Sequence, residues 1–365
     1  MNPILVLITD THLKEENKDI VIHVFSEAMS HALSRDLTTV YCLGDIFESR
    51  KGQLASLLCA FEDILDMYQD NNVKLITCVG NHDKTDYSDS YSFLSPFKHH
   101  PALHLVPVFE TFDINENTTF SLLSFFDDVL YLQYITKLKE QLSLNSPGKR
   151  HLLGTHIGIS GVRMHSGEEF KSEKINGKVF DFFQEVYVGH FHDAGTYFNN
   201  VHYIGSAFQH DFGEDMDKGL SIISENNDTS LDKIQLNNSE GENNDILVEK
   251  IQLDTPCFRK FVYNVDSVNE STYLYIQKLK EDNPNDMIRV VLTGQDADIK
   301  AFNKFNLLSL GIDIKIKSDK IERMEIENNV HMFDNNNIKE QFKVFCEKSS
   351  LDVVKGESYL TQIIK

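Results

Sequence analysis

The first half of the chain alternates short apolar runs, rich in β-branched residues, with longer amphipathic stretches. Runs of the first kind predict buried strands, and stretches of the second kind predict helices. We expect strands at Ile4–Thr9, Thr38–Leu43, Val73–Val79, Thr119–Phe125, Arg150–Thr155 and Glu185–Val188. Helices are expected at Asp19–Ser34 and Gln53–Gln69. Such alternation is typical of a layered α/β or α+β domain.

The second part of the chain divides near Pro256. Before it, from Gly195 to Leu253, the pattern predicts mainly strands. Beyond it, a β-α-β-α-β pattern covers Phe258–Val265, Asn269–Lys280, Ile288–Thr293, Asp298–Ser309 and Ile312–Lys317. We therefore expect a main domain at 1–254, a small accessory domain at 255–335 and a helical tail at 336–365. Apolar residues at helical spacing in the tail fit either packing on its own domain or docking to a partner.

Charge limits what the surface can bind. The chain has 365 residues and a formal net charge of −21. A surface this acidic repels nucleic acid over most of its area, so any contact with DNA must be local or assisted by metal ions. The polar and acidic run 237–244 predicts an exposed hairpin loop.

The cysteines and the apolar runs bear on the compartment. Five cysteines are scattered along the chain and never form a Cys-x-x-Cys pair, which predicts reduced thiols in an intracellular protein. The apolar runs fall far short of the about 20 residues that a membrane-spanning helix needs. The N-terminus lacks the basic region of a secretory signal. We expect a cytoplasmic protein, in the host cytoplasm if a virus encodes it, with no membrane partner.

Five of the predicted strands run into residues that can bind metal ions. These are Asp10-Thr11-His12, Gly44-Asp45, Gly80-Asn81-His82-Asp83, His156 and Gly189-His190-Phe191-His192. Ligand sites in sheet proteins gather at the carboxyl ends of strands, and glycine there lets the backbone approach a bound group closely. A single histidine at a strand end is more often structural than a ligand, and a single Gly-Asp is a common turn. The five together predict one shared metal centre.

These motifs, in this order, resemble the signature of the calcineurin-like metallophosphoesterases. Within that superfamily the chain is most similar to the SbcD-type recombination nucleases and their smaller phage relatives. The cues are Tyr203-Ile204-Gly205-Ser206 after the Gly-His-Phe-His motif, and then Phe212-Gly213-Glu214. The resemblance covers residues 1 to about 225 by motif and continues to about 320 by layout. It implies a four-layer αββα sandwich with a small C-terminal α/β cap that binds DNA, and a helical tail.

The resemblance also implies how metal ions would be held. Asp10, His12 and His192 would bind one divalent cation, Asn81, His156 and His190 a second, and Asp45 would bridge the two. Two such ions lower the pKa of a water molecule and neutralise the phosphoryl oxygens of the substrate. Mixed imidazole, carboxylate and amide ligands suit Mn²⁺, Fe or Zn²⁺ better than Mg²⁺. Similarity to manganese-dependent nucleases favours Mn²⁺.

His82 is expected to be catalytic and not a ligand. A protonated imidazole beside the phosphate could stabilise transition-state charge or protonate the leaving oxygen. Asp83 would either hydrogen-bond His82 and fix its tautomer, or cap the turn. Glu48 stands where relatives often carry His or Asp, which leaves its role open. The histidines outside the motifs, His210 among them, are expected to be structural or exposed.

The resemblance implies a Mn²⁺-dependent DNA exonuclease and endonuclease that works with an SbcC-type coiled-coil ATPase in DNA repair and recombination, and it allows a homodimer. The alternative is another phosphoesterase on the same scaffold, either a protein phosphatase or a small-molecule phosphodiesterase. Against it, Gly44-Asp45 continues without the Asp-Arg-Gly run usual in phosphatases. A scaffold without metals would lack ligands, yet every ligand position is filled. Because the chain is acidic, we expect the isolated protein to bind duplex DNA weakly.

Overall fold

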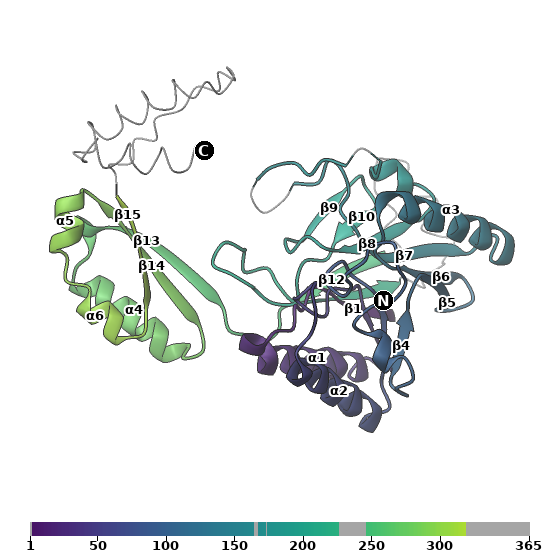
Figure 1. Cartoon of the computed structure of the whole chain (residues 1–365), viewed down its shortest axis with the longest axis horizontal. Helices are drawn as coiled ribbons and strands as arrows, with labels where there is room; N and C mark the ends of the chain where they lie inside the picture. The colour runs from purple at the N-terminus through teal and green to yellow at the C-terminus, as the bar shows by residue number, and fades with distance from the viewer. Residues whose placement is uncertain (1, 164–166, 173, 226–245, 319–365) are drawn as a thin grey trace, which may run out of the picture. The chain divides into compact units, whose positions relative to one another are not determined.

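The structure is a computed structural model that describes residues 2–163, 167–172, 174–225 and 246–318. Two six-stranded sheets form the main body (Figure 1). The first has the order β12 (Ile246–Ile251), β11 (Leu220–Glu225), β1 (Asn2–Ile8), β2 (Thr39–Cys42), β3 (Lys74–Cys78), β4 (Leu103–Val106). The second has the order β5 (Phe109–Asp113), β6 (Thr118–Leu123), β7 (Arg150–His156), β8 (Glu185–Gly189), β10 (Val201–Tyr203), β9 (Gly195–Tyr197).

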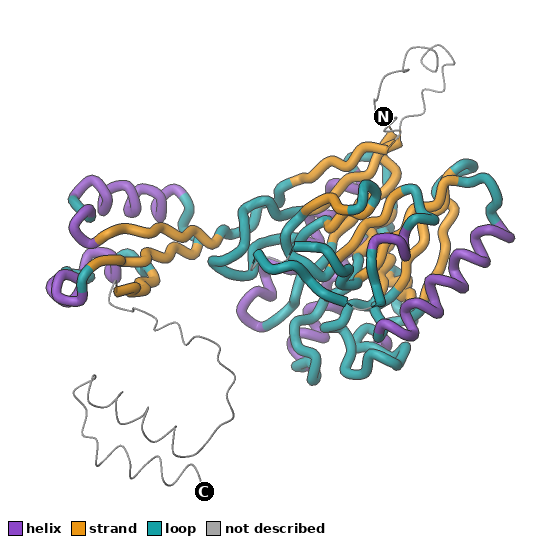
Figure 2. The backbone as a smooth tube through the Cα atoms, turned by 90° about the horizontal axis from the view of Figure 1, so that it is seen from above, coloured by secondary structure: helices purple, strands orange, loops and turns teal. Residues whose placement is uncertain are grey.

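Helices cover the outer faces of both sheets. The long ones are α1 (Lys18–Leu33), α2 (Ala55–Asp70) and α3 (Asp128–Asn145), and Figure 2 shows strands running between helices of the main body. Short 3₁₀ turns lie at Glu15–Asn17, Ser95–Phe97, Gly177–Phe180 and Val265–Ser267. None of the helices in the described part of the chain combines the length and the apolar character needed to cross a bilayer.

Alternation of side chains along the strands builds the layers, because successive residues of a strand point to opposite faces of its sheet. Along β1, Val6 belongs to the core beneath α1 and α2, whereas Leu5 and Leu7 pack between the two sheets. Along β7, Leu152 belongs to the core between the sheets and Leu153 to the core beneath α3. Three apolar cores therefore separate four layers, and the predicted αββα sandwich is confirmed.

A third, three-stranded sheet follows the main body in the sequence. Its order is β13 (Phe258–Asn264), β14 (Met287–Gly294), β15 (Asp313–Ser318), and the helices α4 (Glu270–Asp282), α5 (Asp296–Ala301) and α6 (Phe305–Ser309) lie between these strands in the chain. Ile276, Val290 and Leu307 belong to a core of its own. The accessory domain limits 255–335 stay a prediction, because residues 319–335, the tail 336–365 and the loop 237–244 lie outside the described residues.

The predicted elements and the observed ones differ in four places. The helix expected over Asp298–Ser309 is two helices, because Phe302 adopts an extended backbone that ends α5. The sequence reading missed β4, β5 and α3. The apolar face of α3, with Tyr131, Ile135, Leu138 and Leu142 buried at helical spacing, was a readable signal.

Candidate metal centre

The carboxyl ends of β1, β2, β3, β7 and β8 bring the predicted residues together. β1, β2 and β3 pair in parallel in the first sheet, and β7 pairs in parallel with β8 in the second, so their ends lie at common edges. Asp10 follows β1, Asp45 follows β2, Asn81 follows β3, His156 ends β7 and His190 follows β8. Donor atoms of Asp10, His12 and Asp45 lie within 4.8 Å of one another, and so do those of Asp45, His156 and His190.

One side of this cluster, which we call the Asp10 side, contains Asp10, His12 and His192. The Nε2 atoms of His12 and His192 lie 3.1 Å apart, and Oδ1 of Asp10 is 3.7 Å from the first and 3.9 Å from the second. Carboxylates lie behind both imidazoles. Nδ1 of His192 donates to Oε1 of Glu214 at 2.6 Å. Nδ1 of His12 is 2.8 Å from Oε2 of Glu48, an ion-pair contact whose angle falls short of a hydrogen bond.

The opposite side, which we call the Asn81 side, contains Asn81, His156 and His190. Oδ1 of Asn81 lies 3.0 Å from Nε2 of His156 and 2.8 Å from Nδ1 of His190. Behind His156 stands a backbone group and not a carboxylate, because its Nδ1 donates to the carbonyl of Leu43 at 2.8 Å. The ring of Phe125 stacks on His190 with a centroid separation of 6.2 Å.

Asp45 lies between the two sides. Its Oδ2 is 3.1 Å from Nε2 of His156 and 3.8 Å from Nε2 of His12. Its Oδ1 accepts the backbone N–H of His82 at 2.8 Å. A single carboxylate is therefore within reach of both groups of imidazoles, as the predicted bridging role requires.

The backbone at the cluster is strained. Asp10, His12, Asp45 and His190 have φ values of 51°, 45°, 53° and 93°, in the left-handed region that side chains rarely adopt. Strain of this kind is maintained only where the surrounding structure enforces it, and it is common at functional sites. Close packing does so here, because a Cβ on Gly80 would lie 2.1 Å from Oδ1 of Asp45. Glycine at 80 is thus a steric requirement of the site.

Burial penalises every charge in the cluster, and the opposite charges decide which groups ionise. For His12, burial opposes protonation, but the carboxylates of Asp10 and Glu48 outweigh it and raise its pKa to about 10. For His156, the nearby Asp45 likewise overcomes burial and raises the pKa to about 9. Burial, with His156 close by, lowers the pKa of His190 to about 4. These values describe the protein without bound metal.

The donor arrangement fits divalent cations. His156 Nδ1 must carry a proton to donate to a carbonyl, so once Nε2 loses its own proton its lone pair faces the carboxylate of Asp45. With His192 Nδ1 donating to Glu214 and a carboxylate at Nδ1 of His12, the Nε2 lone pairs of these two imidazoles face each other. Both arrangements are favourable only when a proton or a cation lies between the facing atoms. Two cations, one on each side, would satisfy both.

His82 lies beside the cluster, with its ring centroid 4.7 Å from that of His12. Its Nδ1 donates to the carbonyl of Glu48 at 2.5 Å, and its Nε2 is 2.7 Å from Nη2 of Arg50. Burial lowers the pKa of His82 in the metal-free protein, which makes a protonated imidazole less favourable there than in a free histidine.

Asp83 accepts hydrogen bonds from backbone groups and not from His82, contrary to one of the two roles that the sequence allowed. The Asp83 carboxylate accepts backbone N–H groups of Asp45, Gly80 and Phe47 at 2.9, 2.9 and 3.0 Å. The alternative, that Asp83 orders the turn, therefore describes its contacts. The carbonyl of Glu48, and not Asp83, fixes the tautomer of His82.

Sequence reasoning did not place His210 beside the centre and gave no role to Glu214. His210, expected to be structural or exposed, lies beside the Asp10 side: its Nε2 donates to the carbonyl of Asp10 at 2.8 Å and its ring centroid is 5.0 Å from that of His12. No ligand motif contains His210. Its position between the Tyr-Ile-Gly-Ser and Phe-Gly-Glu runs, both quoted as family cues, was the available signal.

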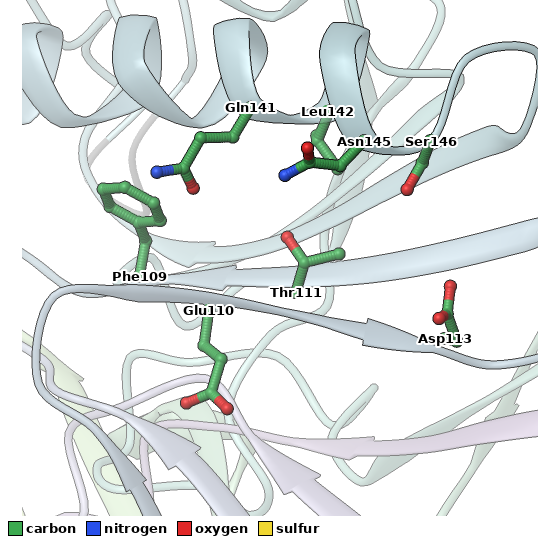
Figure 3. Close-up of a pocket in the computed structure, with 8 residues that line it drawn as sticks. All are labelled: Phe109, Glu110, Thr111, Asp113, Gln141, Leu142, Asn145 and Ser146. Carbon is green, nitrogen blue, oxygen red and sulfur yellow. The ribbon is translucent and has the colours of Figure 1, made fainter.

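A groove of about 400 Å³ lies elsewhere, between β5 and the C-terminal half of α3. Figure 3 shows Gln141 and Asn145 of the helix extending toward Phe109 and Thr111 of the strand. None of its lining residues belongs to the histidine and carboxylate clusters described above. The cluster at the strand ends is accordingly the candidate site.

Known proteins resemble the chain to different degrees. The "Putative phosphoesterase 244L" of Invertebrate iridescent virus 6 is 25% identical over 307 residues, which cover 82% of this chain and 97% of the relative. A dimetal phosphatase of Danio rerio has a TM-score of 0.36 at 15% identity, covering 55% of this chain and 86% of its own. The nuclease MPE of Pseudomonas putida has a TM-score of 0.25 at 12% identity, covering 54% and 65%.

The family model of the calcineurin-like phosphoesterases matches residues 4–194, which span every proposed ligand from Asp10 to His192. Members of this family typically bind two divalent metal ions, and the two sides of the cluster offer a place for each. The chain therefore belongs to the calcineurin-like phosphoesterases and is a metal-dependent phosphoester hydrolase.

Proposed function

We propose that the protein hydrolyses phosphodiesters with two divalent cations, in the arrangement that the resemblance implies. Asp10, His12 and His192 would hold one cation, Asn81, His156 and His190 the other, and Asp45 would contact both. Two contacts carry this proposal. On the Asp10 side, Nε2 of His12 faces Nε2 of His192. On the Asn81 side, Nε2 of His156 faces Oδ2 of Asp45. When bound, the cations supply a nucleophilic water at neutral pH and neutralise charge on the phosphoryl oxygens. The mixed nitrogen and oxygen donors favour Mn²⁺ over Mg²⁺.

The chain's own groups would position the proton transfers. Because Nδ1 of His82 donates to the Glu48 carbonyl, Nε2 is the free ring nitrogen, which would take up a proton from solvent and could then pass it to the leaving oxygen. The Glu48 carbonyl holds the ring in one tautomer, and the N–H of His82 to Asp45 ties its backbone to the shared carboxylate. His82 would thus act as acid–base group without ligating metal.

We further propose that the substrate is DNA and that the activity serves repair or recombination. Support comes from the similarity of the motifs to SbcD-type nucleases and from the β-α-β-α-β unit that follows the main body. The net charge of −21 predicts weak binding of duplex DNA by the isolated chain, so DNA affinity would depend on a partner of the SbcC-type ATPase class or on a homodimer. The tail 336–365, outside the described residues, is the proposed docking segment, and cytoplasmic action remains part of this proposal.

The direct test is incubation of end-labelled linear duplex DNA with purified protein, with and without Mn²⁺. Mn²⁺-dependent cleavage is expected in the wild type and should fall by about 100-fold or more in His82→Ala, since a positioned proton-transfer group contributes about 10²–10⁴-fold. His23→Ala, on the exposed face of α1 and paired with Glu27, is the matched control and should retain wild-type activity.

Two results would contradict parts of the proposal. Hydrolysis of bis(p-nitrophenyl) phosphate without DNA cleavage would keep the metal-dependent centre and remove DNA as the unaided substrate. Equal activity of His82→Ala and His23→Ala would remove His82 from the chemistry. For the tail, deletion of 337–365 should abolish capture of the ATPase subunit, and unchanged capture would contradict docking there.

A further inference from the structure

Arg50 places a guanidinium group at the edge of the metal centre. Its Nη2 lies 2.7 Å from Nε2 of His82, and its side chain is exposed to solvent. Arg50 follows Glu48 by two residues, so one short turn carries the groups that contact both nitrogens of the His82 ring. The family motifs do not include Arg50, and the sequence reading gave it no role.

This cation has no carboxylate partner among the described residues, and its contact with His82 is its one hydrogen bond there. Two other cations near the centre, Lys218 and Lys84, differ. Lys218 is buried, donates to Asp193 at 3.0 Å, and lies within 4.0 Å of Glu214 and Asp215. Lys84 is buried against the ring of Phe126 and donates to the carbonyl of Asp89. In an acidic protein, an unneutralised guanidinium beside the site therefore stands out as a group able to bind an anion.

The contact with His82 leaves most of the guanidinium available. A guanidinium has five N–H donors and no acceptor. Since Nδ1 of His82 donates to the Glu48 carbonyl, Nε2 presents a lone pair and accepts from Arg50, which uses one donor. The remaining donors form a planar fork of the kind that matches two oxygens of a phosphate.

We propose that Arg50 binds a phosphoryl oxygen of the substrate and thereby recognises it. This inference rests on the proposed phosphodiester function, and it assigns substrate binding to a residue outside the metal ligands. A phosphate group at the centre would supply the guanidinium of Arg50 with an anionic partner. As the guanidinium turns from the imidazole to the phosphate, Nε2 of His82 is released to face the substrate. Binding of the correct anion and exposure of the proton-transfer atom are thus coupled at one contact.

The test measures binding of inorganic phosphate to the Mn²⁺-loaded protein by calorimetry. Arg50→Gln should weaken binding by about 10-fold or more, because hydrogen bonds to ionised groups are roughly twice as strong as neutral ones. Arg50→Lys keeps the charge but loses the planar fork of donors. Its phosphate affinity should lie between that of the wild type and that of Arg50→Gln. Lys51→Gln removes one exposed positive charge at the adjacent position and is the matched control, with an expected change below about twofold, as for an exposed charge pair. Mn²⁺ affinity should be unchanged in all three variants.

Steady-state kinetics with bis(p-nitrophenyl) phosphate give the second readout. Arg50→Gln should raise KM more than it lowers kcat, as expected for a group that binds the substrate phosphate. Equal loss of phosphate affinity in Arg50→Gln and Lys51→Gln, or no phosphate binding by the wild type, would overturn the proposal. Arg50-dependent phosphate binding in a protein that hydrolyses no diester would support Arg50 as an anion site while contradicting the proposed function.

Discussion

The Asp10 side and the Asn81 side of the centre hold their imidazoles by different means. On the Asp10 side, Glu214 and Glu48 stand behind His192 and His12, and the side itself contributes a carboxylate. On the Asn81 side, the backing group of His156 is a carbonyl and the side contributes a neutral amide. The first side therefore carries more negative charge than the second.

This difference has a consequence for metal binding. A carboxylate behind an imidazole fixes its orientation and raises its basicity as a ligand, more than a neutral carbonyl does. We therefore expect the Asp10 side to bind a divalent cation more tightly, and the Asn81 side to depend more on the shared carboxylate of Asp45.

The largest effect is expected from Asp45→Asn, which weakens both sides at once. Asparagine retains the oxygen that accepts the His82 N–H but removes the charge shared by the two cations. Loss of an outer-shell partner typically costs about 10–100-fold, so loss of this shared charge should lower activity by more than about 100-fold. Metal analysis and hydrolysis assays measure it. Asp66→Asn, at an exposed carboxylate paired with His100, is the control, and equal behaviour of the two variants would contradict a bridging role.

The second effect is on pH dependence. In the metal-free protein the pKa is about 10 for His12 and about 9 for His156, so both imidazoles are protonated at neutral pH. A cation must displace one of these protons on each side, and raising the pH removes that competition. Mn²⁺ affinity should therefore rise by about tenfold per pH unit from pH 7 to about 9 on each side, with release of protons. An affinity that levels off above pH 7, as for histidines with an ordinary pKa, would contradict this charge arrangement.

A smaller effect, confined to the Asp10 side, is expected from Glu214→Gln. The Glu214 carboxylate, on a side chain that is 5% exposed, accepts from His192, and the amide would keep its size but not its charge. Mn²⁺ affinity on that side should fall by about 10–100-fold. Glu185→Gln is the matched control. Its Oε2 lies 2.6 Å from Nε2 of His202, the same distance as between Glu214 and His192, and this pair does not belong to the centre. Equal Mn²⁺ affinities of these two variants would show that Glu214 has no influence on the metal.

Glu48→Gln should have the smallest effect. Its side chain is 42% exposed, and its ion-pair contact with His12 lacks hydrogen-bond geometry. Solvent screens such contacts, so we expect a loss in Mn²⁺ affinity nearer the lower end of that range, about 10-fold. Glu110→Gln, whose carboxylate is 43% exposed and 2.8 Å from His104, is the control. A larger loss than for Glu214→Gln would reverse the expected order of the two carboxylates.

Much of the layered fold was readable from local pattern. The strands ending near Asp10, Asp45, Asn81, His156 and His190 are continuous apolar runs, and their polar ends follow immediately in the sequence. Such signals are local, so short motifs were enough to gather the residues that converge in the structure. The split of the predicted helix at Phe302 follows from an extended backbone angle that the sequence pattern does not reveal. Helix α3 could have been predicted from the helical spacing of its apolar residues.

The groups around the proposed ligands were not readable in the same way. Glu214, His210 and Arg50 reach the site from loops, and nothing in their own positions indicates which imidazole they contact. The tautomer of His82 depends on a backbone carbonyl, which every residue possesses and no motif marks. Three-dimensional contacts across long sequence separations, such as the 200 residues between His210 and Asp10, decide these roles.

The most direct test of the two-sided centre is a calorimetric titration of the metal-free protein with Mn²⁺, repeated for Asn81→Asp. We predict that the wild type binds two ions with unequal affinities, the tighter one lost in Asp10→Asn. A carboxylate at position 81 should bring the two affinities closer together. Binding of a single ion, or of two ions with equal affinity that Asp10→Asn weakens equally, would contradict the account.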